Sequence, residues 1–284
     1  VLKKKLLVLG STGMLGHQVA DYFLKLDDYN VADIAFRSKL RQKTIIVDVT
    51  DKERLEKVLT ELNPDFIVNC IGILIHGSHN VENAIYLNAY LPHHLKKISK
   101  NIDAKLIHIS TDCVFSGAKG SYIESDIKDG KGVYSQTKIL GEIEDEVNLT
   151  LRTSIIGPEL KDNGEGLFHW FMSQSDNVSG FTKSIWSGVT TLELAKAIKC
   201  AIDLDITGLY HVTNNLSINK YNLLKLFQKY TEKDIIINPV EGHIVDKSFM
   251  DTRVLIDMDI PVYEDMVKEM IDNIKSSNMY SYEI

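Results

Sequence analysis

The 284-residue sequence has few cysteines, no long apolar run and no excess of basic charge. Its three cysteines, Cys70, Cys113 and Cys200, are too few and too widely spaced for a zinc knuckle or a disulfide framework, so we expect a reduced, cytoplasmic setting. No apolar stretch approaches the roughly 18 residues that a membrane span requires. The formal net charge of -7 argues against a broad surface for nucleic acid or anionic membrane. We therefore predict no nucleic-acid partner and no membrane partner.

The first sixteen residues have the pattern of a strand, a glycine turn and the start of a helix. An apolar run over 4–9 leads directly into Gly10-Ser-Thr-Gly13-Met-Leu-Gly16, and helical apolar spacing begins at Leu15. Glycines let such a turn fold tightly and let backbone N–H groups approach a pyrophosphate at the amino end of the helix. Glycine also serves plain strand-to-helix connections, so the turn alone does not identify a ligand. The candidate dinucleotide contacts here are Gly10, Thr12, Gly13, Met14, Leu15 and Gly16.

Strands and helices alternate along the first half of the chain. The pattern predicts strands over 30–36, 44–47, 66–71 and 105–109, and helices over 52–62 and 80–100. This alternation predicts an α/β protein with a Rossmann-type, doubly wound parallel sheet, whose ligand crevice lies beyond the carboxyl ends of the strands. Residues that follow predicted strand ends should line that edge, namely Gly10, Arg37, Asp48, Gly72 and Thr111.

The regular alternation weakens after about Arg152, where prolines and glycines break the chain into shorter pieces. We predict a nucleotide-binding domain over 1–155 and a smaller C-terminal substrate-binding lobe over 156–284. A helix and a strand within 191–213 should return to the sheet. The polar segment 276–284 is expected to form a frayed tail.

Tyr134 and Lys138 stand four residues apart and follow the hydroxyl-rich segment around Thr111. Because positions i and i+4 share a helical face, we expect the Lys138 ammonium to lie near the Tyr134 phenol and to lower its pKa. A phenol with a lowered pKa is a better proton donor near neutral pH. Thr111 would then hold the carbonyl group that receives the proton.

The same spacing occurs at Tyr221 and Lys225, so spacing alone does not identify a catalytic pair. Tyr221 belongs to an amphipathic segment of the second lobe and has no hydroxyl-rich strand end at a comparable distance upstream. We interpret Tyr221 as a packing residue. The position of Tyr134 after the glycine turn and the Thr111 segment is what distinguishes it.

Together these motifs resemble the extended short-chain dehydrogenase/reductase superfamily. More narrowly, Ser110-Thr-Asp-Cys-Val-Phe-Ser-Gly117 and Leu151-Arg-Thr-Ser154 are similar to segments of the dTDP-4-dehydrorhamnose reductase family and its relatives in surface-polysaccharide biosynthesis. The resemblance implies reduction of a nucleotide-linked 4-keto-6-deoxy sugar by NADPH or NADH, with Thr111, Tyr134 and Lys138 as the catalytic set. Cys113 and Ile155 replace a tyrosine and a tryptophan that are frequent in the rhamnose enzymes, so the sugar stays open.

Two alternatives remain beside a reductase. One is a sugar-nucleotide epimerase or dehydratase of the same superfamily, for which Asp112 is the available acid next to Thr111. The other is a non-catalytic nucleotide-binding regulatory subunit, against which the intact Thr111, Tyr134 and Lys138 argue. A homodimer is the assembly that we consider.

The end of the second predicted strand favours NADP(H) over NAD(H). No acid stands there to bind the ribose 2′-hydroxyl, whereas Arg37 and Ser38 can contact a 2′-phosphate. The alternative is that Arg37 is a solvated loop charge. Asp48 and Val49 resemble the superfamily position that contacts adenine, although this turn also supplies an N-cap through Thr50 or Asp51.

Further cofactor and substrate contacts are expected around these motifs. The other cofactor candidates are Cys70, Ile71 and Gly72, together with Tyr134 and Lys138. The candidate contacts of a nucleotide-sugar substrate are Val114, Phe115, Ile155, Lys183, Trp186 and Arg253. A lone tryptophan such as Trp186 is also a common core residue. His76 and His79 lack the further ligands of a zinc site, and we predict no metal.

Overall fold

The computed structural model describes residues 2–253 and 258–284. A parallel sheet of seven strands forms its centre, in the order β11-β6-β5-β4-β1-β2-β3. These strands are β1 (Lys4–Leu9), β2 (Tyr29–Ala35), β3 (Ile45–Ile46), β4 (Phe66–Asn69), β5 (Lys105–Thr111), β6 (Leu149–Thr153) and β11 (Gly208–His211). The predicted Rossmann-type fold is confirmed. Its strand order reverses direction between β1 and β4, which is where open α/β sheets bind their ligands.

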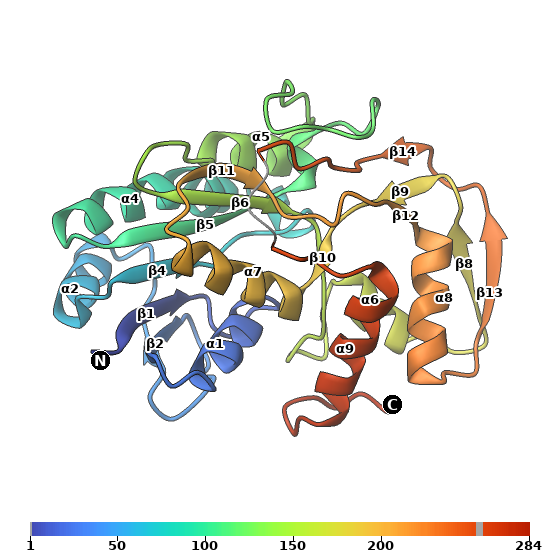
Figure 1. Cartoon of the computed structure of the whole chain (residues 1–284), viewed down its shortest axis with the longest axis horizontal. Helices are drawn as coiled ribbons and strands as arrows, with labels where there is room; N and C mark the ends of the chain where they lie inside the picture. The colour runs from blue at the N-terminus through green and yellow to red at the C-terminus, as the bar shows by residue number, and fades with distance from the viewer. Residues whose placement is uncertain (1, 254–257) are drawn as a thin grey trace.

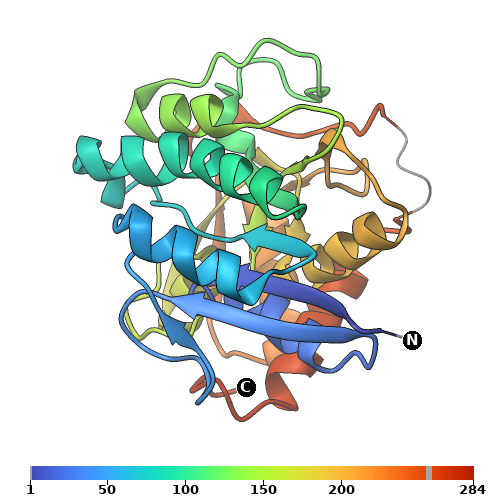
Figure 2. The ribbon, with the colours of Figure 1, turned by 90° about the vertical axis from the view of Figure 1, so that its left-hand side faces the viewer.

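Helices cover both faces of the sheet because neighbouring residues of the strands point to opposite sides. Leu6 and Val8 of β1 pack in one apolar cluster with α1 (Gly16–Leu24) and α7 (Thr191–Asp203). Leu7 and Leu9 pack in another with α2 (Lys52–Leu62) and α4 (Leu91–Asn101). Figure 2 shows α2, α4 and α5 (Gly132–Gly141) one above the other on the second face.

The helical region predicted over 80–100 contains a π-helical segment. It begins with α3 (Val81–Ala84), continues as the π-helical η2 (Ile85–Tyr90) and ends as α4. The short 3₁₀ turn η1 (Gly77–His79) precedes it. Such wide turns occur often at functional sites. Here the turn places the buried Asn88 against the loop after β4, where its amide bonds both backbone groups of Ile73 at 2.8 and 3.0 Å.

The smaller lobe is built from short elements, and Figure 1 shows it beside the carboxyl edge of the sheet. Its strands form three small sheets, β10-β7, β12-β9-β14 and β13-β8. Its elements are β7 (Ile155–Ile156), α6 (Leu167–Met172), β8 (Asn177–Phe181), β9 (Ser184–Trp186), β10 (Val189–Thr190), β12 (Ile218–Asn219), α8 (Lys220–Thr231), β13 (Ile236–Val240), β14 (Val245–Asp246) and α9 (Tyr263–Lys275). The chain returns to the large sheet between them, since β11 pairs with β6.

One hydrophobic cluster extends through both parts of the molecule. It joins Leu6 and Val8 of the central strand to Phe168 of α6, Leu223 of α8 and Met266 of α9, all of which are buried. The smaller lobe is therefore packed directly onto the nucleotide-binding half. Within 2–253 and 258–284, no helix has the length and apolar character needed to cross a membrane.

The segment after α9 is attached to the body of the protein and is not the frayed tail that its polar composition predicts. The hydroxyl of Tyr280 bonds His17 Nε2 at 2.9 Å and accepts a hydrogen bond from Gln18 on α1. The hydroxyl of Tyr282 accepts the backbone N–H of Glu159 at 2.9 Å. Two tyrosines thus connect α1 with the loop that precedes α6, which sequence composition does not reveal.

Candidate active site

A cavity of about 750 Å³ lies between the carboxyl edge of the sheet and the smaller lobe. Such a volume lies in the usual range of small-molecule sites. The sheet contributes residues that follow β1, β4, β5 and β6, and the smaller lobe contributes the opposite wall. Predicted residues that line it are Gly13, Met14, Leu15, Cys70, Ile71, Gly72, Thr111, Tyr134, Lys138, Ile155 and Trp186. The cavity thus brings the three proposed catalytic side chains together with the glycine turn.

The glycine turn is tight enough that two of its positions require glycine. Gly10 has a φ of 79°, a conformation that side chains disfavour. A Cβ atom at Gly16 would lie 2.1 Å from the carbonyl oxygen of Gly10, because α1 starts directly against the end of β1. Gly13, by contrast, faces the cavity. Backbone N–H groups at the amino end of a helix are a ready site for an anion.

Thr111, Tyr134 and Lys138 come from two neighbouring elements. Thr111 is the last residue of β5, and its hydroxyl donates to Asp112 at 2.9 Å while accepting the backbone N–H of Cys113 at 3.2 Å. Tyr134 and Lys138 lie on α5, which packs against β5 and η2. The ammonium of Lys138 donates to the carbonyl oxygen of Ile109 at 2.8 Å. The strand therefore fixes one end of the lysine side chain and the helix fixes the other.

The expected lowering of the Tyr134 pKa does not occur in this arrangement. Burial raises the pKa of the phenol, the nearby Cys113 raises it further, and a hydrogen bond with Thr111 acts in the opposite direction. Burial also lowers the pKa of Lys138 to about 8, which Glu142 partly opposes. The ammonium of Lys138, which is bonded to the backbone carbonyl of Ile109, does not offset this rise in the pKa of Tyr134. Tyr134 is consequently fully protonated at neutral pH, which is the form that donates a proton.

A buried ion pair supports the strand end that carries Thr111. Arg152 of β6 donates two hydrogen bonds to Glu142, each at 2.8 Å, and both side chains are almost completely buried. Glu142 also accepts from Ser110 at 2.6 Å and from Lys128 at 2.9 Å. Burial favours the neutral acid, yet the bonds from Arg152 and Ser110 hold the pKa of Glu142 below its ordinary value. The ionised carboxylate thus anchors the residue next to Thr111.

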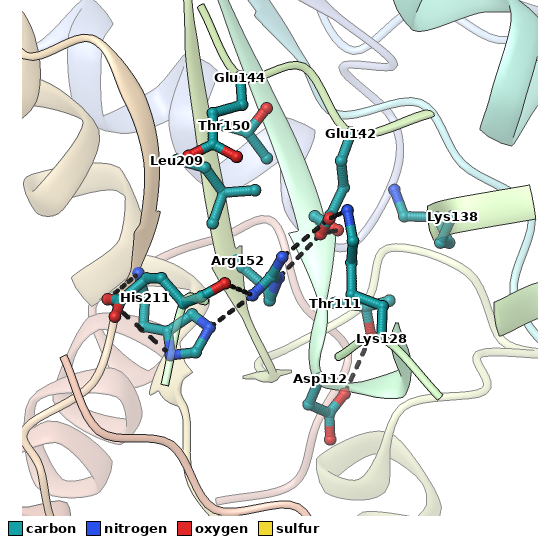
Figure 3. A network of polar contacts seen from close by, with 12 residues as sticks. Thr111, Asp112, Lys128, Lys138, Glu142, Glu144, Thr150, Arg152, Leu209 and His211 are labelled. Atoms are coloured by element: carbon teal, nitrogen blue, oxygen red, sulfur yellow. Dashed lines mark hydrogen bonds and ion pairs between the residues drawn. The ribbon is translucent and has the colours of Figure 1, made fainter. Parts of the chain in front are cut away.

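Arg152 also extends the network to the far edge of the sheet, and Figure 3 shows it between Glu142 and His211. Its guanidinium donates to Nε2 of His211 at 2.8 Å, so that nitrogen must be the acceptor. The Nδ1–H of His211 then donates to the carbonyl oxygen of Met250 at 3.1 Å. Burial, followed by the charge of Arg152, lowers the pKa of His211 to about 4, although Glu124 opposes this. His211 is therefore a neutral imidazole of defined tautomer.

The neutral state of His211 predicts a pH dependence of stability. The pKa of histidine is about 6.5 in the unfolded chain, so between pH 6.5 and about 4 the unfolded state binds more protons than the folded one. The free energy of unfolding should fall by about 1–3 kcal/mol over this window as the pH decreases. Urea denaturation at several pH values measures it. His211→Gln, which titrates no proton, should reduce the fall, and an equal fall in this variant would contradict the assignment.

The remaining predicted cofactor residues lie at the same sheet edge but do not line the cavity. Arg37 and Ser38 are exposed after β2, and the Arg37 guanidinium stacks over Phe36 at 4.8 Å. The Asp48 carboxylate accepts two hydrogen bonds from Thr50, and Val49 is buried. Asp51 is the N-cap of α2, accepting from Arg54 at 3.0 Å, as the capping alternative predicted. The contacts expected of Arg37, Ser38, Asp48 and Val49 stay predictions. Gly10, Thr12 and Gly16 form the turn behind Gly13.

The expected substrate roles of Val114 and Phe115 require correction. Although they follow Thr111 in sequence, the 3₁₀ turn η3 (Asp112–Val114) directs both into a separate core. Both side chains are completely buried, and Phe115 stacks on Tyr122 with a centroid distance of 4.2 Å. A side chain without exposed surface cannot contact a substrate.

Lys183 and Arg253 also lie away from the cavity. Lys183 is exposed between β8 and β9, and its backbone N–H donates to the carbonyl oxygen of Glu241. The guanidinium of Arg253 donates to the carbonyl oxygen of Leu209 at 2.6 Å and forms an ion pair with Glu144 at 2.7 Å. Both side chains lie at the outer surface and do not line the cavity, so their contacts with a substrate stay predictions.

Several cavity residues were absent from the sequence-based predictions. They are Asn69 at the end of β4, Ser154 after β6, Glu159 in the following loop and Lys220 at the start of α8. Ser154 was part of a quoted motif, and its hydroxyl accepts the indole N–H of Trp186 at 2.8 Å. Lys220 directly precedes Tyr221. The sequence feature that could have pointed to Lys220 is its position at the beginning of an amphipathic helix.

The profile of the protein family described as RmlD substrate binding domain matches residues 4–248. The chain belongs to this family. It is thus an extended short-chain dehydrogenase/reductase related to the dTDP-4-dehydrorhamnose reductases. The motifs around Thr111 and Tyr134, from which that resemblance was drawn, lie within the matched residues.

Known proteins similar to this RmlD-family chain carry different functional names. It is 27% identical over 237 residues to methionine adenosyltransferase 2 subunit beta of Bos taurus, covering 78% of this chain and 70% of that protein. It is also 27% identical over 278 residues to the probable low-salt glycan biosynthesis reductase Agl14 of Haloferax volcanii, covering 89% and 85%. The crystal structure of dTDP-4-dehydrorhamnose reductase from Bacillus anthracis with NADP matches with a TM-score of 0.80 at 21% identity, covering 96% and 100%. The last likeness establishes the fold.

The cavity of this RmlD-family protein fits a dinucleotide. The close approach of Gly16 to Gly10 leaves no room for a side chain inside the turn, and Gly13, Met14 and Leu15 present the outer surface of that turn to the cavity. Ile71 and Gly72 continue the same wall after β4. These residues would hold the pyrophosphate and ribose groups, and Lys138 and Tyr134 line the same cavity.

Proposed function

We propose that this protein is an NADP(H)-dependent reductase of a nucleotide-linked 4-keto-6-deoxy sugar. The observation that carries the proposal is the convergence of Thr111, Tyr134 and Lys138 with the glycine turn on one cavity. The proton donor, the carbonyl-binding hydroxyl and the phosphate-binding turn are the three parts that a keto reduction needs. Membership of the RmlD family and the similarity to a glycan biosynthesis reductase support this choice of substrate class.

The reaction adds a hydride to the carbonyl carbon and a proton to its oxygen. A bound reduced dinucleotide supplies the hydride. Thr111 donates its hydroxyl hydrogen to the carbonyl oxygen of the substrate. The hydroxyl must therefore break its hydrogen bond to the Asp112 carboxylate. Tyr134 delivers the proton and becomes a phenolate, and the ammonium of Lys138 can stabilise that negative charge once it leaves the carbonyl oxygen of Ile109. Lys138 has a pKa of about 8, so it is mainly charged at neutral pH.

The end of β2 supports a preference for NADP(H). The nearest acid, Asp33, is completely buried, and its carboxylate already accepts Ser11 at 2.9 Å and Arg41 at 2.6 Å. It is therefore not free to bind a ribose 2′-hydroxyl. Arg37 is exposed at the end of the strand and provides a charge for a 2′-phosphate.

Arg37→Ala should raise the KM for NADPH by about 10-fold or more, because one charge-assisted hydrogen bond is lost. The KM for NADH should stay within about twofold, since NADH lacks the 2′-phosphate. Steady-state kinetics with both cofactors measures the change. Lys43→Ala, at another exposed cation of the β2–β3 connection, is the matched control. An equal change in KM for NADPH and NADH would show that Arg37 does not bind the 2′-phosphate.

The alternative of a regulatory subunit without turnover is favoured by one comparison. Methionine adenosyltransferase 2 subunit beta, which matches 78% of this chain, is by its name a subunit of a transferase. The intact catalytic set argues for turnover here. A dehydratase or epimerase would need Asp112 as an acid or base next to Thr111. In this structure the Asp112 carboxylate accepts a hydrogen bond from the Thr111 hydroxyl instead.

The proposed function is tested by following NADPH absorbance with dTDP-, UDP- and GDP-linked 4-keto-6-deoxy sugars. We expect stoichiometric oxidation of NADPH with at least one of them. Binding of NADPH, without oxidation by any sugar of the panel, would overturn the reductase and favour the regulatory subunit. Conversion of a sugar without net NADPH oxidation would favour the epimerase or dehydratase.

A further inference from the structure

Lys220 presents a positive charge to the catalytic cavity from the smaller lobe. It is the first residue of α8, a helix of twelve residues, and lines the cavity that Thr111 and Tyr134 line from the sheet. Its ammonium lies 5.5 Å from the centroid of the Trp186 ring. The ring is itself fixed, because Trp186 is buried and its indole N–H donates to Ser154. The side chain of Lys220 is thus held over a rigid surface in the cavity wall.

Lys220 lacks the kind of hydrogen-bond partner that Lys138 and Lys247 have. Lys138 donates to the carbonyl oxygen of Ile109 at 2.8 Å, and Lys247 donates to the sulfur of Cys113 at 3.2 Å. Lys220 makes no hydrogen bond or ion pair with any residue in the described ranges of the chain. Burying an ammonium without a partner is unfavourable, so buried charges are normally paired. An unpaired ammonium facing a cavity indicates that its partner belongs to the ligand.

We propose that Lys220 binds the diphosphate of the nucleotide-linked sugar and so orients the sugar ring toward Thr111 and Tyr134. The inference rests on the proposed function. In such a substrate the diphosphate joins the anomeric carbon, on the side of the ring opposite the 4-keto group. A keto group held by Thr111 and Tyr134 on the sheet side therefore directs the diphosphate toward the smaller lobe, where Lys220 lies.

The start of α8 suits an anion in this position. As the first residue of α8, it stands at the positive end of the helix dipole, which adds to the charge of its own ammonium. The side chain of Asn219 caps the helix by accepting the N–H of Asn222 at 2.7 Å. The glycine turn, which lines the same cavity from the end of β1, is the candidate site for the cofactor phosphates. Lys220 is therefore a specificity residue for the substrate and not for the cofactor.

The charge of Lys220 also predicts how binding depends on pH. Burial lowers the pKa of Lys220 to about 8. Asp112 and Cys113, which follow β5, face Lys220 and raise this pKa. Lys247, which follows β14, also faces Lys220 and lowers it. Above pH 8 the free protein should lose this charge, and the affinity for a diphosphate should decrease. Arg does not lose its proton in this range, so Lys220→Arg should bind with little change between pH 7 and about 9.

The test measures binding of dTDP, UDP and GDP, without turnover, by isothermal titration calorimetry. Lys220→Met should weaken binding of the preferred diphosphate by about 10- to 100-fold, as expected for loss of a charge-assisted contact. The KM for the sugar nucleotide should rise similarly, whereas kcat changes little and the Kd for NADPH stays within about twofold. Lys225→Met, on the exposed side of the same helix, is the matched control and should behave as wild type.

The outcomes separate this inference from the proposed function. Unchanged diphosphate affinity in Lys220→Met, an equal loss in Lys225→Met, a loss of NADPH affinity instead, or no diphosphate binding by the wild type would each overturn the role of Lys220. Diphosphate binding that depends on Lys220 in a protein that reduces no sugar would support it while refuting the reductase. Reduction of a sugar nucleotide with the same KM in wild type and Lys220→Met would refute the role of Lys220 alone.

Discussion

Replacing Tyr134 by phenylalanine is expected to reduce kcat for sugar reduction by about 10³-fold, because proton donation by a positioned group contributes about 10²–10⁴-fold. The ring and its packing on α5 remain, and only the proton donor is lost. Thr111 at the end of β5 still binds the carbonyl, so the KM should change little. The NADPH absorbance assay gives both constants, and calorimetry shows whether NADPH binding is retained.

The chain contains its own control for this substitution. Tyr221 and Lys225 repeat the spacing of Tyr134 and Lys138, but they lie on α8, where the Tyr221 ring packs over Gly180 of β8. Tyr221→Phe should therefore leave kcat within about twofold of wild type. If Tyr134→Phe retains wild-type turnover, or if both variants lose activity equally, Tyr134 is not the proton donor.

The parts of the fold that follow from local sequence were predictable. The strand Lys4–Leu9 and the helix Lys52–Leu62 have the expected bounds, because Gly10 terminates the apolar run of the first and Asp51 caps the second. The π-helical turn at Ile85–Tyr90 was not predictable, since one wider turn leaves the apolar spacing of a helix nearly unchanged. The two- and three-residue strands of the smaller lobe are likewise too short to show a period.

Some residues of the candidate site were likewise predictable from local sequence, and others were not. Thr111, Tyr134 and Lys138 were predictable because the strand end and the helix each carry a local motif. Val114 and Phe115 were misassigned, because proximity in sequence to Thr111 does not reveal that a 3₁₀ turn directs them into a core. Lys220 was missed because its role depends on the opposition of two lobes, which no local pattern encodes.

The buried network beneath Thr111 was hidden for a further reason. Its members Ser110, Glu142, Arg152 and His211 come from separate segments, and the side chains of arginine and glutamate are normally at the surface. The pairing of β5 with β6 and of β6 with β11 brings Ser110, Arg152 and His211 together, and Glu142 joins them from the end of α5. The sheet register and the packing of α5 thus combine four separate residues into support for the catalytic threonine.

Arg152→Met should lower the free energy of unfolding by about 3–5 kcal/mol, which is typical when one partner of a buried ion pair is removed. The loss is large because Glu142 would keep its charge with only Ser110 and Lys128 as partners, while Nε2 of His211 would lose its donor. Urea denaturation at pH 7 measures the change. Thr111 follows Ser110 directly, so any folded variant should also reduce sugar more slowly.

The size of this effect distinguishes a buried pair from a surface pair. Lys57→Met removes the ion pair with Glu61 on α2, where both side chains are about two-thirds exposed, and should change the free energy of unfolding by about 0.5 kcal/mol or less. The double variant Arg152→Met/Glu142→Met should lose less than the sum of the two single variants, because no unpaired charge remains buried. A strictly additive double variant would mean that the two side chains contribute independently, and that the ion pair does not hold the strand end carrying Thr111.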